Sequence, residues 1–507
     1  MKRFTLAVLL SILCSTAFAQ FSFLGRSTPE NEGLRSRDIL NYIDTVMRQK
    51  DTDIHGVMIL RNGKVIAEKY NEPFAAQYGH TLYSCSKTFT AVGVGLAIQD
   101  SLLHLDDPIV CVLDSAMLPP VIGDSLAAIT VENLLTMQSS LPVDTRMRTI
   151  EDEWVKAYLS QKMVDLPGTL FAYDSIDSYL LAAIVQHVTG KTLFQLLRDR
   201  IFTPMGITQV SWEQSPEGVS CGGWGLYMQL ESMAKFGQLL VQRGEWKGEQ
   251  LVSSDWIDQM LTHHAANAGG SRYGYHIWLM DNGIARCDGA YGQYIYVIPN
   301  RNMVIAMTQC MRGNGNLEHN ATKALAAKAP ENGAAFDPIT PTADQKTLQN
   351  ARYRLSPAKG KPSSDHHLFP IRMRLPKNDL GWSEIELDLR QTKRQQSPIV
   401  QATVTTRTGE TFPLICDYQN WHTNEIKGLP INFREFRNNF SNILPPFYVA
   451  ASYSWVNDDA LSIRLQFVNW LTSCRLQFNF NGTTTVRTEF QPGHSNKHVT
   501  FTSTILK

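Results

Sequence analysis

Residues 84–90 of the chain form the stretch Ser-Cys-Ser-Lys-Thr-Phe-Thr. Ser84 and Lys87 stand three positions apart, a spacing that puts a hydroxyl and an amine on one helix face, about 5 to 6 Å apart at Cβ. At that separation the amine can accept the hydroxyl proton and make the oxygen a nucleophile. Such an amine needs its pKa lowered from about 10.4 to about 7 or 8, which partial burial and a neighbouring hydrogen bond can supply. The stretch therefore predicts a helix that begins near Ser84 and a candidate centre for acyl transfer.

The flanking sequence supports a helix start at Ser84. A polar connection over residues 70–81 precedes it, and apolar Phe89, Val92 and Leu96 follow at helical spacing. The N–H groups and the positive dipole end of a first helical turn favour an oxyanion there. The structural alternative is an N-capping Ser84 followed by a solvated Lys87.

The same Ser-x-x-Lys spacing occurs twice more. Ser232 and Lys235 lie in a predicted amphipathic helix, where we expect both side chains to face water. Ser356 and Lys359 enclose a proline in a proline-rich segment, which disfavours a helix there. We therefore expect only the Ser84 pair to carry chemistry.

Composition limits the class of protein. The 507 residues carry 47 basic and 47 acidic side chains and are 43% hydrophobic. The chain can therefore build large cores, and it lacks the basic excess typical of nucleic-acid binding. Its length predicts two or three domains.

The first nineteen residues resemble an export signal. Lys2 and Arg3 precede an apolar run over residues 4–13, and Ala17-Phe18-Ala19 provides a small-residue cleavage site. We therefore expect a periplasmic or secreted protein with no transmembrane segment. A lipid-anchored form at Cys14 is disfavoured, because Leu13 occupies a position that requires a small residue.

The cysteines do not form a recognisable framework. Beyond Cys14 they are scattered and odd in number, although one or two bridges remain possible: Cys85, Cys111, Cys221, Cys287, Cys310, Cys416 and Cys474. The only His pair at i, i+4 is His494 and His498, in a turn with Gly and Pro and without a nearby acid. We expect no metal and no other cofactor.

The order of predicted elements indicates an α/β (α+β) domain over residues 20–330. Residues 55–70 predict a hairpin that turns at Asn62-Gly63, and residues 84–244 are mostly helical. Strands return at residues 294–298 and 303–307. Strands at both ends with helices between them predict one antiparallel sheet assembled from the two ends of the domain.

A linker and a second domain follow. Residues 331–364 are rich in proline, which indicates a linker. Residues 365–507 show period-two alternation, as in Ile385, Leu387 and Leu389, and Asn481-Gly482 marks a further hairpin. We therefore expect a β-sandwich or barrel domain at the C-terminus. Its composition identifies no partner.

Seven motifs in order resemble the serine β-lactamase and penicillin-binding protein superfamily. The resemblance is strongest to class C-type enzymes, their esterase relatives and the 6-aminohexanoate-dimer hydrolases, and it runs from about Gly56 to Gln309. The motifs are Gly56-Val-Met-Ile-Leu with Asn62-Gly63, Ser84-Cys-Ser-Lys87, Leu134-Leu-Thr-Met-Gln-Ser139, Pro167-Gly-Thr-Leu-Phe-Ala-Tyr173-Asp-Ser175, Gly222-Gly-Trp-Gly-Leu226, Phe236-Gly-Gln-Leu, and Gly292-Gln293 before Tyr-Ile-Tyr-Val-Ile-Pro299.

This resemblance implies a β-lactamase/transpeptidase-like fold and an acyl-enzyme mechanism. Ser84 would be the nucleophile, Lys87 its proton acceptor, and Tyr173 the group that passes the proton to the leaving group. Which of Lys87 and Tyr173 takes the first proton stays open. Ser175 stands where the family often has Asn, as a shorter substrate-binding side chain.

The third family element departs from its pattern. Where relatives carry Lys-Thr-Gly or His-x-Gly beside the nucleophile, this chain has Cys287-Asp288-Gly289, followed by Ala290. The resemblance implies that these residues contact substrate and that the N–H groups of Ser84 and Ala290 form the oxyanion hole. The cation that receives a substrate carboxylate is absent from this element, although Arg286 or Arg272 could replace it. A small neutral ester or amide is therefore expected in preference to a β-lactam or a D-amino-acid peptide.

Three other interpretations compete with this one. Gly218-Val-Ser220-Cys-Gly222 matches the G-x-S-x-G nucleophile elbow, but the preceding residues are polar and contain proline. Cys85 is a poor nucleophile, because one residue along a helix turns its side chain about 100° from the face of Lys87. A catalytically silent sensor or binding protein with the same fold is the third alternative.

Overall fold

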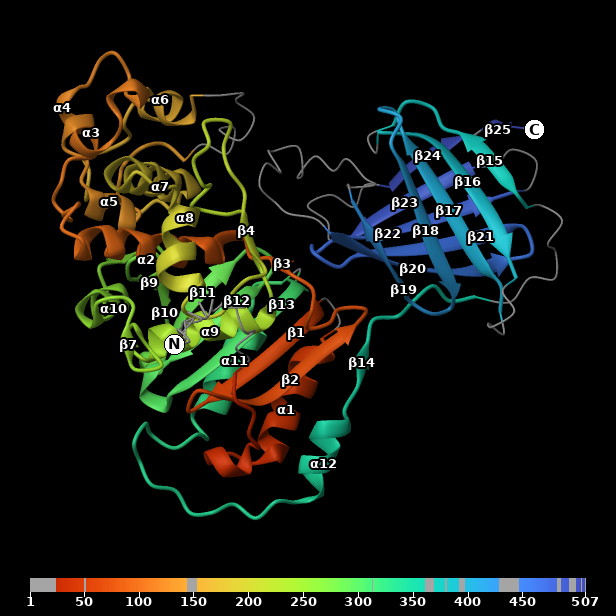
Figure 1. The fold of residues 1–507 in the computed structure, drawn as a ribbon, viewed down its shortest axis with the longest axis horizontal. Helices are drawn as coiled ribbons and strands as arrows, with labels where there is room; N and C mark the ends of the chain where they lie inside the picture. The colour runs from red at the N-terminus through yellow and green to blue at the C-terminus, as the bar shows by residue number, and fades with distance from the viewer. Residues whose placement is uncertain are drawn as a thin grey trace, which may run out of the picture.

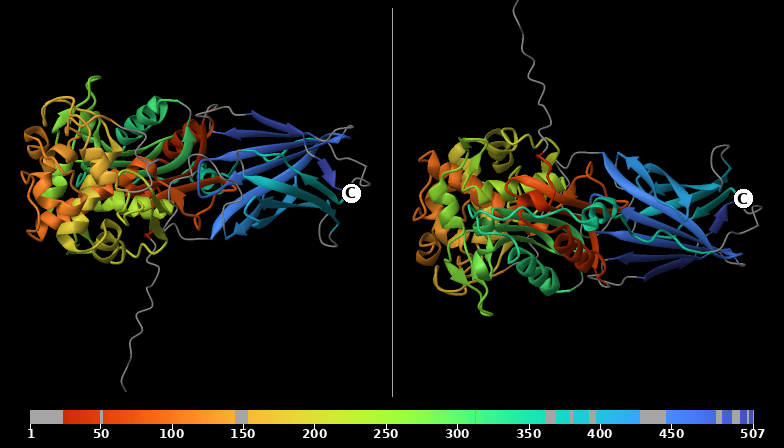
Figure 2. Two further views of the ribbon diagram at one scale, coloured as in Figure 1. Left: turned by 90° about the horizontal axis from the view of Figure 1, so that it is seen from above. Right: turned by 90° about the horizontal axis from the view of Figure 1, so that it is seen from below.

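The computed structural model consists of two β-sheet bodies that lie end to end along the long axis (Figures 1 and 2). It describes residues 24–49, 52–143, 153–311, 313–360, 369–378, 381–391, 397–427, 446–480, 485–491, 498–502 and 504–506. The predicted export signal, the Asn481-Gly482 turn and His494 lie outside these residues.

The first sheet has nine described strands and is assembled from distant parts of the chain. In spatial order they are β14 (Tyr353–Arg354), β2 (Lys64–Glu72), β1 (Thr52–Arg61), β13 (Met303–Met311), β12 (Gln293–Ile298), β11 (Ala285–Gly289), β10 (Trp278–Leu279), β9 (Arg272–Tyr273) and β8 (Ala265–Ala266). Strand β1 pairs antiparallel with both β2 and β13. The expected antiparallel sheet from the two ends of the domain is therefore confirmed.

The hairpin between β1 and β2 turns where the sequence predicts it. Asn62 and Gly63 have φ of 52° and 73°, left-handed values that Asn and Gly adopt readily. The next hairpin, β12 to β13, passes through the 3₁₀ turn Pro299–Arg301 and a left-handed Asn302. Both connections are short, so each pair of strands is fixed in register.

Helices cover both faces of this sheet. On one face lie α1 (Ser36–Met47) and α11 (Asn316–Ala326), which pack with Val57 and Ile59 of β1. The opposite face carries the larger helical layer, which packs with Met58 and Leu60. That layer comprises α2 (Ser86–Gln99), α3 (Ile109–Val112), α4 (Asp124–Ala127), α5 (Val131–Leu135), α6 (Trp154–Leu159), α7 (Ser175–Thr189), α8 (Leu193–Leu197), α9 (Leu230–Val241) and α10 (Ser254–Met260).

Shorter elements connect these layers. The turns are η1 (Glu30–Glu32), η2 (Tyr83–Cys85), η3 (Ser115–Met117), η5 (Arg198–Phe202), η6 (Asp281–Gly283) and η7 (Pro299–Arg301). The short strands are β3 (His80–Thr81), β4 (Val210–Trp212), β5 (Leu226–Met228), β6 (Glu245–Trp246) and β7 (Glu249–Gln250). Strands β3, β5 and β4 form a small separate sheet.

Helix α2 is buried nearly all round, as befits a helix in the middle of this layer. Two glycines let its neighbours approach closely. A Cβ at Gly93 would meet Leu193 at 2.2 Å, and one at Gly95 would meet the Trp256 indole at 2.1 Å. Within the described residues no single helix is long and apolar enough to cross a bilayer, although the bent pair 175–189 and 193–202 reaches that length and composition together.

The segment expected as a linker contains ordered elements. Helix α12 (Ala343–Asn350) packs against α1, and β14 pairs in parallel with β2. Thr342 caps α12 by accepting a hydrogen bond from the Asp344 N–H at 3.3 Å. The sequence did not predict α12, because the segment is rich in proline and the helix depends on packing against α1.

The C-terminal part is a single curled sheet, a half-barrel. In spatial order its strands are β24 (His498–Thr502), β23 (Thr485–Gln491), β22 (Ser473–Asn479), β21 (Ala460–Phe467), β20 (Phe447–Asn457), β18 (Thr411–Tyr418), β17 (Ile399–Thr406), β16 (Trp382–Arg390), β15 (Ile371–Arg374) and β25 (Thr504–Leu506), with β19 (His422–Ile426) beside β20. Of the residues that alternate in β16, Ile385 and Leu387 are fully buried, as the period-two pattern predicts.

Candidate active site

Ser84 and Lys87 lie together at the junction of the helical layer and the sheet. Lys87 Nζ donates a hydrogen bond to Ser84 Oγ at 3.0 Å. Lys87 is 1% exposed, whereas Ser84 keeps partial exposure and can be reached from solvent. The structural alternative of a solvated Lys87 is therefore wrong.

Ser84 sits slightly before the expected helix. It lies in the 3₁₀ turn η2, which leads into α2 at Ser86. Tyr83 has a φ of 47°, so the chain reverses sharply just before the serine. In this turn Ser84 keeps its i, i+3 contact with Lys87 and lies at the N-terminal end of α2.

Two further oxygens accept hydrogen bonds from the amine of Lys87. Its Nζ lies 2.9 Å from Ser175 Oγ and 2.9 Å from the Gly223 carbonyl oxygen. It also lies 4.7 Å from the centre of the Tyr173 ring. The structure thus brings Ser84, Lys87, Tyr173 and Ser175 together around one amine.

Tyr173 comes just before α7, and its hydroxyl interacts with the Ser84 side chain. Burial raises the pKa of Tyr173 above its ordinary value, and the Ser84 bond only partly offsets this effect. The phenol therefore keeps its proton at neutral pH. An alcohol and an amine thus lie within hydrogen-bond distance of each other, with the phenol beside them.

A buried carboxyl pair fixes the start of α7 behind this centre. Asp174 caps the helix by accepting a bond from the Ile176 N–H at 2.9 Å. The Tyr158 hydroxyl donates to Asp174 at 2.7 Å and also lies 3.3 Å from Asp177. Burial, then the neighbouring Asp174, raises the pKa of Asp177 well above its usual range. Tyr173 and Ser175 flank Asp174 and are thereby held in place.

Strand β11 brings the third family element to the Ser84 turn. A Cβ at Gly289 would lie 2.2 Å from the Leu82 carbonyl oxygen, so only glycine allows this approach. Ala290 follows at the exposed end of the strand. Cys287 is buried on the helical side, and burial raises its pKa to about 12. Its thiol is therefore not an acid or a nucleophile at neutral pH.

Asp288 projects from the opposite face of β11. Its Oδ2 accepts a hydrogen bond from Arg286 Nε at 2.8 Å. Burial nevertheless raises the pKa of Asp288, because the Arg286 cation only partly compensates for lost hydration. Arg272 is further out and bonds the Met280 carbonyl at 2.9 Å and Asp281 at 3.4 Å. Neither arginine stands as a lone cation at the site.

Sequence reasoning missed an aromatic wall beside Tyr173. The ring of Tyr173 lies 5.6 Å from that of Trp278 and 6.2 Å from that of Tyr273. Phe171 packs against Tyr273 at 5.4 Å. The only signal in the sequence was the aromatic content of residues 171–173 and 273–278. This signal is unspecific, because aromatic side chains are equally common in cores.

His276 was missed as well. Its Nδ1 bonds the Leu135 carbonyl at 3.0 Å, and its backbone carbonyl accepts from Thr88 at 2.7 Å. Burial, then the nearby charge of Lys87, lowers the pKa of His276 to about 3, so the ring is neutral. The carbonyl of Gly223 also escaped notice, although the Gly222-Gly223 motif marked its loop.

The lysine of the second Ser-x-x-Lys motif and the two competing nucleophiles have structural roles. Lys235 is not solvated as expected. It is 5% exposed and bonds the carbonyls of Met205 and Gly206 at 3.0 and 3.3 Å, because the chain turn at residues 203–206 offers unpaired carbonyls to α9. Ser220 is fully buried and accepts from the Phe194 N–H at 3.2 Å. Cys85 Sγ is also fully buried and bonds the Gln293 carbonyl at 3.0 Å.

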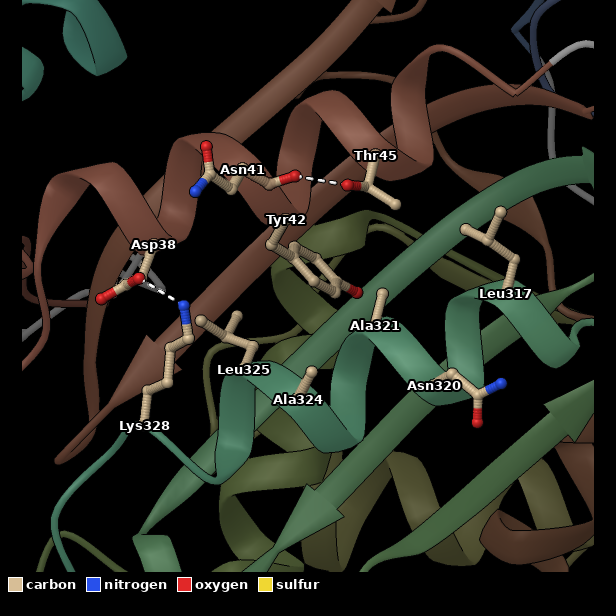
Figure 3. Close-up of a pocket in the computed structure, with 10 residues that line it drawn as sticks. All are labelled: Asp38, Asn41, Tyr42, Thr45, Leu317, Asn320, Ala321, Ala324, Leu325 and Lys328. Atoms are coloured by element: carbon tan, nitrogen blue, oxygen red, sulfur yellow. Dashed lines mark hydrogen bonds and ion pairs between the residues drawn. The ribbon is translucent and has the colours of Figure 1, made fainter.

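A separate cavity lies on the other face of the sheet. It measures about 570 Å³ between α1 and α11, and an ion pair of Lys328 with Asp38 closes one end (Figure 3). Its lining mixes apolar side chains with polar ones such as Asn41, Thr45 and Asn320, and it contains none of the candidate residues. Among the described residues no group of three or more His, Cys, Asp or Glu could bind a metal ion. The chemistry therefore points to the Ser84 cluster.

Comparison with known proteins agrees with this geometry. The sequence model of the family described as Beta-lactamase matches residues 41–329, more than half of the chain. The chain belongs to the Beta-lactamase family. Members of this family are generally serine hydrolases, with esterase, amidase and DD-peptidase activities among them.

Two curated relatives and one solved structure illustrate the range of this Beta-lactamase family. The chain is 24% identical over 251 residues to the 6-aminohexanoate-dimer hydrolase of Paenarthrobacter ureafaciens, covering 45% of this chain and 61% of that protein. It is 25% identical over 242 residues to the "Putative D-alanyl-D-alanine carboxypeptidase" of Escherichia coli (strain K12), covering 41% and 55%. Both alignments span less than two thirds of the relatives' lengths. A penicillin-binding protein homologue from Caulobacter crescentus has a TM-score of 0.50 at 15% identity, over 58% of this chain and 96% of that one, and supports the fold.

Proposed function

We propose that the protein is an exported serine hydrolase that forms an acyl-enzyme on Ser84 with a small neutral ester or amide. The observation that carries this proposal is the 3.0 Å hydrogen bond between Lys87 Nζ and Ser84 Oγ, with the centre of the Tyr173 ring 4.7 Å from the same amine. Export rests on residues 1–19, which have the composition of a cleavable signal.

In the first step Ser84 Oγ bonds to the carbonyl carbon while its proton passes to Lys87. This transfer requires the neutral form of the amine, whose lone pair can accept the hydroxyl proton. The raised pKa of Tyr173 keeps the phenol protonated, which supports Lys87 as the first acceptor. The carbonyl electron pair moves onto its oxygen and gives a tetrahedral oxyanion.

The N–H groups of Ser84 and Ala290 would stabilise that oxyanion. The contact of Gly289 with the Leu82 carbonyl brings the end of β11 beside the Ser84 turn, which supports this assignment. Collapse of the intermediate expels the alkoxide or amine, which takes its proton through the Tyr173 hydroxyl. Water then attacks the acyl-enzyme by the reverse route and releases the acid and Ser84.

The residues of the third family element, Cys287-Asp288-Gly289, indicate which substrate charge the site prefers. Asp288 occupies the position where relatives present a neutral or cationic side chain to a substrate carboxylate. A carboxylate beside Asp288 would be repelled, so esters and amides without an acid group fit better. A D-amino-acid peptidase or weak β-lactamase remains a second hydrolase candidate, supported by the carboxypeptidase relative.

A second candidate function is a catalytically silent sensor or binding protein. The replacement of the usual cation by Cys287 and Asp288 favours it. The assembled Ser84, Lys87, Tyr173 and Ser175 oppose it, because a binding protein does not need this bonding pattern.

The test is labelling with a fluorophosphonate probe, followed by mass mapping and turnover of short-chain nitrophenyl esters. We expect the probe on Ser84, and a loss of turnover of about 10³-fold in Ser84→Ala and Lys87→Met. The matched controls are Ser232→Ala and Lys235→Met, which change the same motif at a structural site and should keep activity in the folded fraction. Folded wild-type protein without label, or a loss under tenfold in Ser84→Ala, would refute the hydrolase and favour the sensor.

A further inference from the structure

The turn between β21 and β22 of the C-terminal half-barrel contacts the first sheet body beside the candidate active site. This turn, residues 468–472, is closed by a hydrogen bond from the Trp470 N–H to the carbonyl of Phe467 at the end of β21, at 3.1 Å. The Trp470 ring is 1% exposed and packs on Phe447 of β20, 5.2 Å between ring centres. The turn is thus anchored in the half-barrel core.

From this anchor the turn makes two hydrogen bonds to the strand that precedes Ser84. The Thr81 N–H donates to the Asn469 carbonyl at 3.0 Å. The Asn469 side chain donates from Nδ2 to the Gly79 carbonyl at 2.9 Å. The same side chain accepts from the Tyr448 N–H at 2.8 Å, which fixes its orientation. Residues 79–81 are therefore paired with a rigid partner only three positions before Ser84.

The turn also holds strand β5. Trp470 Nε1 donates a hydrogen bond to the Tyr227 hydroxyl at 2.9 Å. The two rings meet edge to face, 6.1 Å between centres. The turn thus contacts β3 through Asn469 and β5 through Trp470.

Strand β5 in turn forms hydrogen bonds with residues on both sides of Ser84. The Leu226 carbonyl accepts from the Leu82 N–H at 2.9 Å, and the Leu226 N–H donates to Ser86 Oγ at 3.2 Å. Three residues before Leu226, the Gly223 carbonyl accepts the bond from Lys87. Tyr227 is the neighbour of Leu226, so a displacement of Tyr227 would shift Leu82 and Ser86, the residues that flank the Ser84 turn.

We infer that the C-terminal half-barrel positions the active site, with Asn469 and Trp470 as positioning residues that act through β3 and β5. This inference rests on the proposed function for its activity readout. The half-barrel is then part of the hydrolase machinery. Its β21–β22 turn sets the distance between Ser84 Oγ and Lys87 Nζ without touching either atom.

The test removes one bond from each side of the contact. Trp470→Phe deletes the indole donor, and Tyr227→Phe deletes its acceptor while keeping the ring. Each should slow acylation of Ser84 about three- to tenfold, the effect of one hydrogen bond, with kcat lowered and KM little changed. The double variant should lose no more than either single variant, because both remove the same bond. Asn469→Ala should slow acylation independently.

The control is Tyr453→Phe, which deletes a hydrogen bond of 2.7 Å to the Pro398 carbonyl inside the half-barrel. It should lower stability without slowing acylation in the folded fraction. Equal loss of activity in Tyr453→Phe, or additive losses in the double variant, would overturn the inference.

Hydrogen exchange of the peptide over residues 79–88 provides a readout that does not need activity. It should accelerate in Trp470→Phe, Tyr227→Phe and Asn469→Ala but not in Tyr453→Phe. If wild-type Ser84 takes no label, the proposed function fails and exchange alone decides the positioning role. Unchanged exchange in all three variants overturns the inference even where Ser84 is active.

Discussion

Lys87 Nζ lies 2.9 Å from Ser175 Oγ, so the last residue of the Tyr-x-Ser motif is bonded to the amine of the Ser-x-x-Lys motif. The two residues come from α7 and α2, which pack against each other in the helical layer. This bond orients the amine toward Ser84 rather than toward solvent.

Ser175→Ala should therefore lower kcat about tenfold with little change in stability, since one hydrogen bond to a charged or reacting group is lost. The matched control is Ser178→Ala on the same helix. The Ser178 hydroxyl is buried and has no hydrogen-bond partner among the described residues, so its removal should leave ester turnover unchanged. Equal effects of the two variants on turnover would contradict a specific role for Ser175.

Gly289→Ala should impair both activity and stability. The added Cβ would sit 2.2 Å from the Leu82 carbonyl oxygen, so β11 has to move away from the Ser84 turn. We expect turnover to fall at least about tenfold, as positioning errors of this kind do. Gly123→Ala is the control, because no atom lies within 4 Å of its Cβ. Ester kinetics beside thermal unfolding would separate the two effects, and full activity in Gly289→Ala would argue against the oxyanion role of Ala290.

Asp288→Asn should widen substrate choice. Removing this carboxylate lessens the repulsion of acidic substrates, which we expect to raise kcat/KM for a carboxylate-bearing ester about fivefold relative to a neutral ester. Asp281→Asn makes the same charge change at a position that is 76% exposed and should leave the ratio unchanged. Competition assays with the paired esters measure it. A ratio that does not move in Asp288→Asn would remove Asp288 from the specificity determinants.

Acid should destabilise the fold through its buried histidines. Burial lowers the pKa of His80 to about 4 and that of His276 to about 3, against about 6.5 when unfolded. Above pH 6.5 both states carry neutral rings and stability does not depend on these groups. Between pH 6.5 and about 4 only the unfolded chain takes up the protons. The free energy of unfolding therefore falls with decreasing pH, by up to about 1.4 kcal/mol per pH unit for each ring.

Denaturant unfolding across this pH range checks the prediction. His80→Gln should reduce the slope of the free energy of unfolding against pH by the contribution of one histidine. His104→Gln, at a side chain 69% exposed, should leave that slope unchanged. A pH dependence that is identical in wild type and His80→Gln would show that this ring is not buried in its neutral form.

Local patterns predicted much of the site and the fold. The Asn62-Gly63 turn and the Ser84 to Lys87 spacing depend on neighbours within a few residues, and sequence records such neighbours directly. The order of strands and helices was enough to predict that the two ends of the domain share one sheet.

Contacts between distant segments were not visible in the same way. The Gly223 carbonyl on Lys87 and the neutral His276 arise from loops that meet only in three dimensions. Lys235 gave the opposite error, because helical amphipathicity does not reveal the carbonyls of residues 205–206 that cover it. Helix α12 was hidden for the same reason, since α1 stabilises it from across the chain.

The pairing of β1 with β13 also governs how the chain reaches its native state. The N-terminal hairpin cannot complete its sheet until a strand about 240 residues further on has left the ribosome, a delay of roughly 10 to 50 s at ordinary translation rates. Contacts of such long sequence separation fold slowly. The nascent polypeptide therefore keeps an unsatisfied strand edge for nearly half of its synthesis, and it is in that interval that chaperones have the most to bind.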